Sequence, residues 1–208
     1  IAPFVAGPEF MYIEPCISPD GQKLYFASNW PGPAGGESFG QEDIWGVDRS
    51  GDGWGEPYNP GPPVNSEFGD FFPSVTNDGT IYFTRGDPEA GTNFIYRCRY
   101  SDGAYQPAEK LPEQVNSMPA QFNAFIAPDE SYIILSVAGR GDSFGGTDYY
   151  ICIRSEDDVW SEPQNLGDTI NTAGTMEHSS YVSPDGMYFF FMRTLIDTKA
   201  RLAEDEFT

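Results

Sequence analysis

The stretch ISPDGQKLYFAS, residues 17–28, has the pattern of two apolar β-strands joined by a tight turn. Asp20-Gly21 separates the apolar runs, and glycine accepts the positive φ that short hairpin turns require. The pattern returns as FFPSVTNDGTIYFTR (71–85), NAFIAPDESYIILSV (123–137) and SSYVSPDGMYFFFMR (179–193). The turn aspartates are Asp20, Asp78, Asp129 and Asp185, spaced by 58, 51 and 56 residues. This regular recurrence predicts a repeat protein.

Further strands follow the first three hairpins. A third strand reads DIWGVDR (43–49), NFIYRCR (93–99) or DYYICIR (148–154). An aromatic residue then opens a fourth strand, at Trp54, Tyr105 and Trp160, and eleven residues later stands Asn65, Asn116 or Asn171. We expect the aromatic residues to pack between repeats. Four antiparallel strands in about 50 to 57 residues match one blade of a β-propeller.

The fold class that we predict is all-β, a β-propeller of four-stranded antiparallel blades. A length of 208 residues favours one domain, residues 1–208. The repeats fall at about 12–69, 70–120, 121–176 and 177–208, and the last is partial. About three complete blades and part of a fourth fit a fragment of a five- or six-bladed propeller. The rival arrangement is a four-bladed ring closed by the N-terminal strand.

The two ends of the chain carry separate expectations. Residues 1–10, IAPFVAGPEF, have the pattern of the end of a fourth strand leading into the first hairpin. Residues 197–207, DTKARLAEDEF, carry the one helical pattern in the sequence. We expect a short helix there and no helix elsewhere.

The hairpins carry a family resemblance. Ser18-Pro19-Asp20-Gly21 and Ser183-Pro184-Asp185-Gly186, together with the DIW strand and the WGEP and WSEP strands, resemble the WD-repeat-like blades of TolB-type β-propellers. The resemblance covers most of the chain and implies a periplasmic or secreted protein. It is specific for fold and poor for function, because such propellers support partner binding, glycan binding and some enzymes.

Charge and composition narrow the range of partners. The formal net charge is -21, spread along the chain, which disfavours nucleic acid and anionic membranes and favours cations or basic partners. No apolar run approaches the roughly 20 residues of a membrane helix. Cys16, Cys98 and Cys152 are odd in number and lack metal-ligand spacing, so we expect buried thiols.

Polar and aromatic residues recur where propeller loops would share one channel rim. Eight residues before the hairpin aspartates stand Tyr12, Asp70, Gln121 and Glu177, with His178 beside the last, and near the second-strand ends stand Trp30, Arg85, Arg140 and Arg193. We take as ligand-binding candidates Tyr12, Trp30, Asp70, Arg85, Arg140, Glu177, His178 and Arg193. Stacking on Trp30 and bidentate arginine donors suit a carbohydrate or an anionic ligand. The alternative is that these groups satisfy loop carbonyls and neighbouring strands.

Two similar acidic loops precede the third strands. They read GESFGQEDIW (36–45) and GDSFGGTDYY (141–150), and they offer the oxygen ligands that calcium prefers. Neither matches the alternating-acid calcium loop. We expect instead that Asp43, Asn93 and Asp148, in register at the start of a strand, accept hydrogen bonds from nearby backbone N–H groups. The loops would then flank the same rim and help to wall a binding site.

Two functions remain open from the sequence. The first is a non-catalytic binding or scaffold propeller for a protein or oligosaccharide ligand, with no cofactor and no bound metal. The second is a carbohydrate-active hydrolase or lyase that uses Asp70 and Glu177, with His178 as a further candidate. We favour the first, because the sequence contains fold signals throughout and no assembled catalytic motif.

Overall fold

A computed structural model describes residues 7–32 and 38–196. The predicted helix at 197–207 and most of the predicted N-terminal strand lie outside these residues. Residues 7–10 form a turn, in which the Phe10 N–H donates to the Gly7 carbonyl. All regular structure in the described part of the chain is β-strand, as the hairpin repeats predict.

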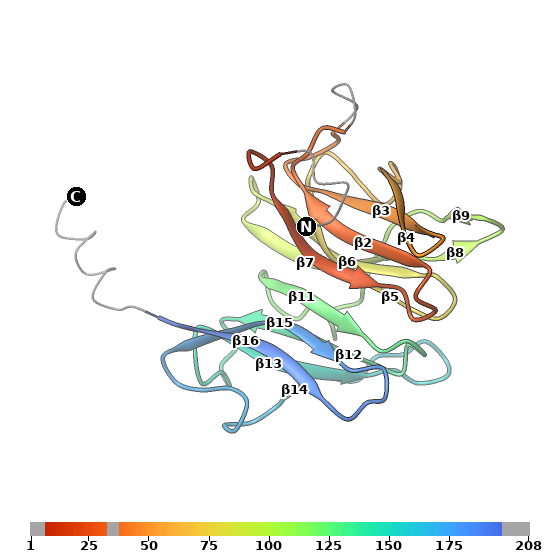
Figure 1. Cartoon of the computed structure of the whole chain (residues 1–208). Coiled ribbons are helices and arrows are strands. Elements are labelled where there is room, and N and C mark those ends of the chain that lie inside the picture. Colours follow the sequence, from red (N-terminus) through yellow and green to blue (C-terminus); the bar gives the residue numbers. More distant parts are fainter. Residues whose placement is uncertain (1–6, 33–37, 197–208) are drawn as a thin grey trace, which may run out of the picture.

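The strands form one sheet per hairpin unit in the first half of the chain (Figure 1). The first sheet has the order β1-β2-β3-β4, with β1 (Tyr12–Ile17), β2 (Lys23–Ser28), β3 (Asp43–Ser50) and β4 (Gly53–Tyr58). The second has the order β10-β7-β6-β5, with β5 (Gly69–Val75), β6 (Ile81–Asp87), β7 (Thr92–Cys98) and β10 (Glu109–Lys110). A separate short hairpin joins β8 (Tyr100–Ser101) to β9 (Ala104–Tyr105).

The second half of the chain forms one larger sheet. Its strands are β11 (Gln121–Ile126), β12 (Tyr132–Ala138), β13 (Thr147–Ile153), β14 (Gln164–Asn165), β15 (Thr175–Val182) and β16 (Phe189–Leu195). The antiparallel set β11-β12-β13-β14 repeats the earlier units, and β15 joins it through a parallel pairing of Thr147 with Met176. The predicted fourth strands are short in the second and third units, where Pro107 and Pro163 stand. Proline removes a donor from a strand ladder.

The first strands of the units follow one another in space. β1 packs against β5, β5 against β11, and β11 against β15. Each has a β-bulge at the same register, with a residue in the left-handed conformation: Glu14, Phe72, Asn123 and Ser179, at φ of 56°, 50°, 53° and 62°. Such non-glycine φ values are uncommon, and bulges bend a strand sharply. No local sequence pattern predicts these bulges.

Hydrogen bonds join these bulges from one unit to the next. The Glu14 Oε2 atom accepts a bond from the Phe72 N–H at 2.7 Å, and the Asn123 side-chain amide donates to the Ser179 hydroxyl at 3.1 Å. The bulges therefore contribute contacts between units as well as curvature.

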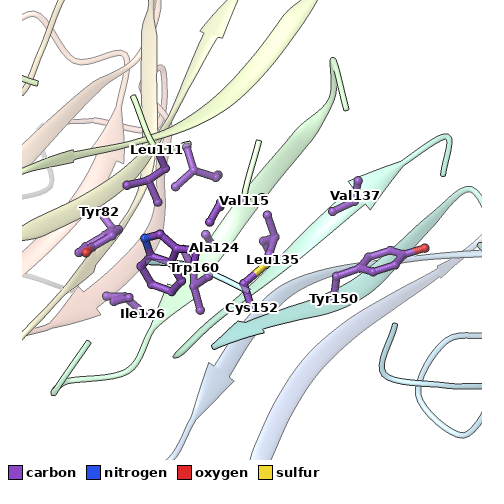
Figure 2. Packing of buried hydrophobic residues seen from close by; sticks show 12 residues of the cluster. Tyr82, Leu111, Val115, Ala124, Ile126, Leu135, Val137, Tyr150, Cys152 and Trp160 are labelled. Carbon is purple, nitrogen blue, oxygen red and sulfur yellow. The ribbon is translucent and has the colours of Figure 1, made fainter. Parts of the chain in front are cut away.

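The core lies between consecutive sheets. One cluster joins Tyr25 and Ile44 of the first sheet to Val75 and Ile81 of the second. A second cluster fills the space between the second and third units (Figure 2) and consists of Tyr82, Ile95, Leu111, Val115, Ala124, Ile126, Ile133, Leu135, Val137, Tyr150, Cys152 and Trp160. Each fully buried aliphatic or aromatic side chain contributes about 1.5 to 3 kcal/mol. Trp160 lies in one cluster with Tyr82 of the preceding sheet, and Tyr105 packs against the cluster that contains Tyr25, as predicted for aromatics between repeats. Trp54 instead packs against a cluster of the first unit.

The repeated asparagines fasten the third strands. Each side-chain amide accepts from the N–H and donates to the carbonyl of one strand residue at 2.8 to 3.0 Å, pairing Asn65 with Ile44, Asn116 with Ile95 and Asn171 with Tyr149. Buried backbone groups at a strand edge need such partners. This requirement explains why the asparagines recur at a fixed offset.

Candidate functional site

Asp70 and Arg85 form an ion pair across the β5–β6 hairpin. They are register partners, and Arg85 Nε lies 2.6 Å from Asp70 Oδ1. The buried Asp70 carboxylate also accepts bonds from the backbone N–H and the hydroxyl of Ser66, and Arg85 donates to the Val64 carbonyl. Burial raises the pKa of Asp70, and Arg85 and Ser66 oppose that rise. The pair ties the preceding loop to the second sheet.

Glu177 and Arg193 repeat this arrangement on β15 and β16. They are register partners with Arg193 Nε 3.0 Å from Glu177 Oε1. Glu177 is fully buried and accepts bonds from the Thr175 and Thr172 hydroxyls, while Arg193 donates to the Ile170 carbonyl. Both candidate carboxylates are thus bound by an arginine and by the loop that precedes them, although among the described residues Glu177 Oε2 is buried without a hydrogen-bond partner.

The third unit departs from this pattern at Gln121. Its side-chain amide donates to the Asn93 carbonyl at 2.7 Å, and its register partner is Val137. Arg140 lies beyond that register and pairs with Asp142 at 3.0 Å. Arg85 and Arg193 are therefore structural equivalents, and Arg140 is not equivalent to either.

The two aromatic candidates lie on the first sheet. Trp30 is buried, with its ring centroid 4.7 Å from that of Trp45, so its faces are not open for stacking on a ligand. Tyr12 is partly buried and contacts Phe26 at a centroid distance of 5.9 Å. Both residues belong to or pack against a hydrophobic cluster.

His178 is held by two hydroxyls. Its Nε2 atom lies 3.0 Å from Thr194 Oγ1 and its Nδ1 atom 3.2 Å from Ser179 Oγ. Within residues 7–32 and 38–196 no carboxylate is hydrogen-bonded to the ring. The arrangement lacks the carboxylate that would orient a general-base histidine in a triad.

The two acidic loops have matching internal hydrogen bonds. Asp43 accepts from the backbone N–H groups three and four residues earlier at 3.1 and 2.9 Å, and Asp148 does the same at 2.9 and 2.7 Å. This confirms the predicted backbone role of both aspartates. A Cβ at Gly40 would overlap the Phe68 carbonyl oxygen, and one at Gly145 would overlap that of Thr175, so each loop requires its glycine.

The described residues contain neither a metal site nor a membrane-spanning helix. No three His, Cys, Asp or Glu side chains in that part of the chain gather as a metal site requires. No helix among them has the length and apolar character needed to cross a membrane.

A cavity of about 310 Å³ opens on the rim between the first and second sheets. Its walls come from the loop before β3, the start of β5 and the β6–β7 hairpin, and they consist of Gln41, Glu42, Gly69, Phe71, Gly86, Asp87, Pro88, Gly91, Thr92 and Asn93. Asp70 stands between two wall residues, but its side chain points into the protein. The prediction that the first acidic loop helps to wall a site fits this geometry.

A pair of glutamates gives the cavity region its electrostatic character. Burial raises the pKa of Glu42. Burial also raises the pKa of Glu14 to about 7, and the nearby Glu42 charge adds to this effect. Apart from the N–H of Phe72, Glu14 has no hydrogen-bond or ion-pair partner among the described residues. This region of the rim therefore favours ligands that bring positive charge or hydrogen-bond donors.

Sequence reasoning missed Glu14, Asp87 and Asn93 as residues at or near the cavity. The positions of Asp87 and Asn93 at the ends of the β6–β7 connection were a usable signal, since connections between second and third strands share this rim. No sequence feature indicated Glu14, because its position depends on the bulge in β1.

Comparison with known proteins supports the fold. No protein-family model matches the chain, and no curated protein sequence matches it. Among solved structures, TolB from Acinetobacter baumannii is similar at a TM-score of 0.50 and 15% identity over 90% of this chain and 42% of that one. A putative TolB from Agrobacterium tumefaciens is similar at a TM-score of 0.54 and 19% identity, over 92% of this chain and 61% of that one. A glycoside hydrolase is similar at a TM-score of 0.55 and 10% identity, over 93% of this chain and 72% of that one.

These similarities define the class of fold: the chain is an all-β protein with a TolB-like, β-propeller type of architecture. The chain spans about half the length of the two TolB structures. At these identities the likeness concerns the fold alone, and activity must be argued from the site.

Proposed function

We propose that this chain is a non-catalytic binding propeller that recognises a protein or an oligosaccharide at the rim bearing the cavity. The observation that carries the proposal is the cavity itself, built by loops of two consecutive units. Its volume falls at the lower end of the range of small-ligand sites, about 300 to 1,000 Å³. By resemblance to the TolB-like structures, we place this function in the periplasm or outside the cell, with about three blades and part of a fourth as its scaffold.

The buried ion pairs support binding in preference to catalysis. Hydrolysis by two carboxylates requires that both reach the substrate. Asp70 and Glu177 are fully buried, and each is bound by its own arginine. No hydrogen bond or ion pair among the described residues joins one pair to the other.

The cavity walls indicate the chemistry of the ligand. Glu42 and Asp87 supply carboxylate acceptors, Gln41 and Asn93 supply amides, and Phe71 supplies an aromatic ring. Sugar hydroxyls or the lysine and arginine side chains of a protein partner suit these groups, whereas acidic ligands are repelled. The ligand that we propose is therefore neutral or basic.

The test compares a cavity variant with a surface variant. Wild-type protein is screened on an array of neutral and acidic oligosaccharides and on an array of lysine-rich peptides. Glu42→Gln should weaken binding of the strongest hit about tenfold, and Glu113→Gln, an exposed glutamate outside the cavity, should leave it unchanged. Equal binding by all three proteins would remove the cavity from the site. Turnover of a glycan that is lost in Glu177→Gln would establish the hydrolase or lyase function instead.

A further inference from the structure

The cavity between the first and second sheets gathers the shielded carboxylates that have no cation of their own. Nine Asp or Glu side chains in the described residues are buried or half-buried. Four of them are paired with an arginine: Asp70, Glu130, Asp158 and Glu177. Two more are held by backbone N–H groups and an asparagine amide: Asp43 and Asp148. The remaining three lie in or beside the cavity: Glu14, Glu42 and Asp87.

The charge of these three carboxylates is poorly compensated. Within residues 7–32 and 38–196, none of them is paired with an arginine, lysine or histidine. Glu14 accepts one backbone N–H, Asp87 accepts two on a single oxygen, and the Glu42 carboxylate accepts no hydrogen bond from the described residues. Arg85, on the same strand as Asp87, is already bound to Asp70. Negative charge that is partly removed from water without a partner is unfavourable, so a bound cation would stabilise this region.

The repeat does not require an acid at the two wall positions. By strand register, the place of Glu42 is taken in the next two units by Asn93 and Thr147. The place of Asp87 is taken by Gly139 and Leu195. Since no carboxylate recurs at either place, the fold of a unit forms without one. Both wall acids are therefore specific to the junction that holds the cavity.

A pair of glycines brings the polar and aromatic walls together. Gly69 and Gly86 are register partners on β5 and β6, and both line the cavity. A Cβ at Gly69 would lie 3.8 Å from Glu42 Oε2. A Cβ at Gly86 would lie 3.4 Å from Phe71 Cε1 and would overlap Asn93 Oδ1. The two missing side chains thus leave a carboxylate, an aromatic ring and an amide close to one another at the cavity wall.

We propose that this cavity binds an organic cation, the ammonium or guanidinium group of its ligand, with Glu42 and Asp87 as charge partners and Phe71 as the ring. Both cations have several N–H donors and no acceptor, which matches oxygen-rich walls. An aromatic ring attracts such a cation through its negative face. No three carboxylates among the described residues gather as a metal ion requires, so the walls favour an organic cation over an inorganic one. The inference rests on the proposed function, because it names the class of ligand for the same cavity.

The experiment titrates the protein with small probes and follows the backbone amide signals of Gly69 and Gly86 by NMR. The cationic probe is Nα-acetyl-lysine amide, and its uncharged match is Nα-acetyl-norleucine amide, which has the same apolar chain without the ammonium. Calcium chloride is the inorganic probe. We expect the lysine probe to shift both signals and to bind at least about tenfold more tightly than the norleucine probe.

Substitutions locate the charge that the probe contacts. Glu42→Gln and Asp87→Asn keep the size of each side chain and should each weaken the lysine probe about tenfold. Phe71→Leu keeps an apolar wall without the ring and should weaken it about threefold. Glu89→Gln removes the same charge from an exposed position in the turn after Asp87, outside the cavity walls, and should bind the probe as wild type does. Melting curves verify that each variant is folded.

The outcomes separate this inference from the proposed function. Equal affinity for the two amide probes would overturn the inference, as would equal effects of Glu42→Gln and Glu89→Gln or a response to calcium chloride alone. A neutral oligosaccharide that binds through Glu42, with no response to the lysine probe, would refute the cation and leave the proposed function standing. No response to either class of ligand would refute both.

A second set of probes identifies the source of the cationic group. Peptides with a single lysine or arginine represent a protein partner, and spermidine and glucosamine represent small amines. Tighter binding by either series supports the organic cation and indicates whether it belongs to a protein side chain or to a small molecule.

Discussion

The junction between the second and third units and the β15–β16 hairpin are built on the same repeat and differ in what surrounds them. At the junction, Tyr82 and Ile133 are fully buried between two sheets. On β16, Phe190 and Met192 are 56% and 55% exposed. The strand pattern is the same in both places. Burial, and with it the stabilising effect of an apolar side chain, depends on whether another sheet lies against it.

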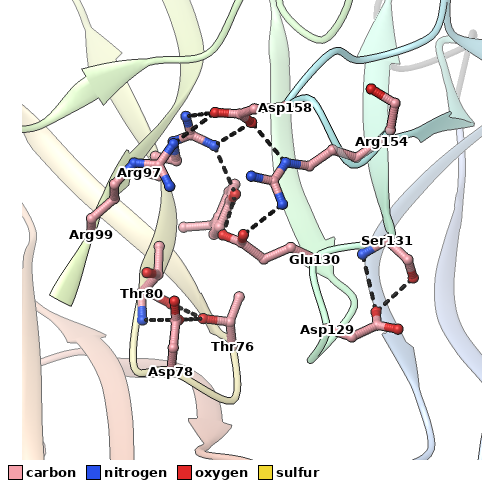
Figure 3. A network of polar contacts seen from close by, with 12 residues as sticks. Thr76, Asp78, Thr80, Arg97, Arg99, Asp129, Glu130, Ser131, Arg154 and Asp158 are labelled. Atoms are coloured by element: carbon pink, nitrogen blue, oxygen red, sulfur yellow. Dashed lines mark hydrogen bonds and ion pairs between the residues drawn. The ribbon is translucent and has the colours of Figure 1, made fainter. Parts of the chain in front are cut away.

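The junction and the β15–β16 hairpin also differ in their polar contacts. At the junction the carboxylate of Asp158 accepts hydrogen bonds from Arg97, Arg99 and Arg154, with the shortest distances at 2.7 Å (Figure 3). Arg154 also reaches Glu130, so the network joins strand β7 to the loops of the third unit. The described residues of the fourth unit contain no counterpart of Asp158. The hairpin aspartate of that unit, Asp185, accepts local bonds from Ser183 and the N–H of Met187, as Asp78 and Asp129 do from residues of their own turns.

The largest expected effect comes from truncating equivalent positions in the two regions. Ile134→Ala removes a buried side chain and leaves a cavity, so we expect a loss of about 3 kcal/mol in the free energy of unfolding. Phe190→Ala, at the equivalent exposed position, should cost less than about 1 kcal/mol. Urea unfolding of both variants measures the contrast. Equal losses would mean that the Phe190 side of the β15–β16 hairpin is covered in solution.

A smaller effect is expected from the arginine network. Asp158→Asn removes the charge shared by three arginines, one of which is buried, and should cost about 2 kcal/mol after allowance for the partial exposure of Asp158. The exposed neighbour Asp157, changed to Asn, provides the matched control. Urea unfolding at neutral pH reports the difference. A loss no greater than that of the control would show that the network adds nothing to the junction.

The pH dependence of this variant follows from its electrostatics. Hydrogen bonds from Arg97, then those from Arg154, hold the pKa of Asp158 well below its usual range. A depressed carboxyl pKa stabilises the fold above the unfolded-state pKa, and the contribution is lost as the pH falls. The stability gap between wild type and Asp158→Asn should therefore shrink on acidification.

The parts of the fold that depend on short stretches of sequence could be predicted. Alternating apolar residues and the Asp-Gly turns identify the hairpins, and a fixed offset identifies the asparagines that fasten the third strands. The ion pairs also have a signal in the sequence, which is the spacing of their residues around the hairpin turn. Asp70 and Arg85 stand eight residues before and seven after Asp78, so folding the hairpin brings them together. Without that pairing, the predicted position of Asp70 and Arg85 on a channel rim made both residues candidates for ligand binding.

The remaining features depend on contacts between distant segments. The bulge that turns Glu14 toward Phe72 has no sequence signature, since Glu, Phe, Asn and Ser occupy its four occurrences. The exposure of Phe190 also could not be predicted, because β16 has the same apolar pattern as the buried strands of the other hairpins. Local pattern decides which strands form, and long-range packing decides which of their side chains remain free.

The smallest expected effect concerns the contact between the first two bulges and is seen as a pH dependence. Burial raises the pKa of Glu14 to about 7, above its ordinary 4.5. A raised carboxyl pKa stabilises the fold at pH below 4.5, and this contribution is lost as the pH rises through about 7. Glu14→Gln keeps an acceptor for the Phe72 N–H and never ionises. It should match wild type near pH 4 and become progressively more stable than wild type as the pH rises through about 7, whereas Glu67→Gln, at an exposed position, should show no such trend. A gap that stayed constant between these pH values in urea unfolding would show that Glu14 ionises normally, and its bond to the Phe72 N–H would then be that of a charged carboxylate, unlike the neutral bond between Asn123 and Ser179.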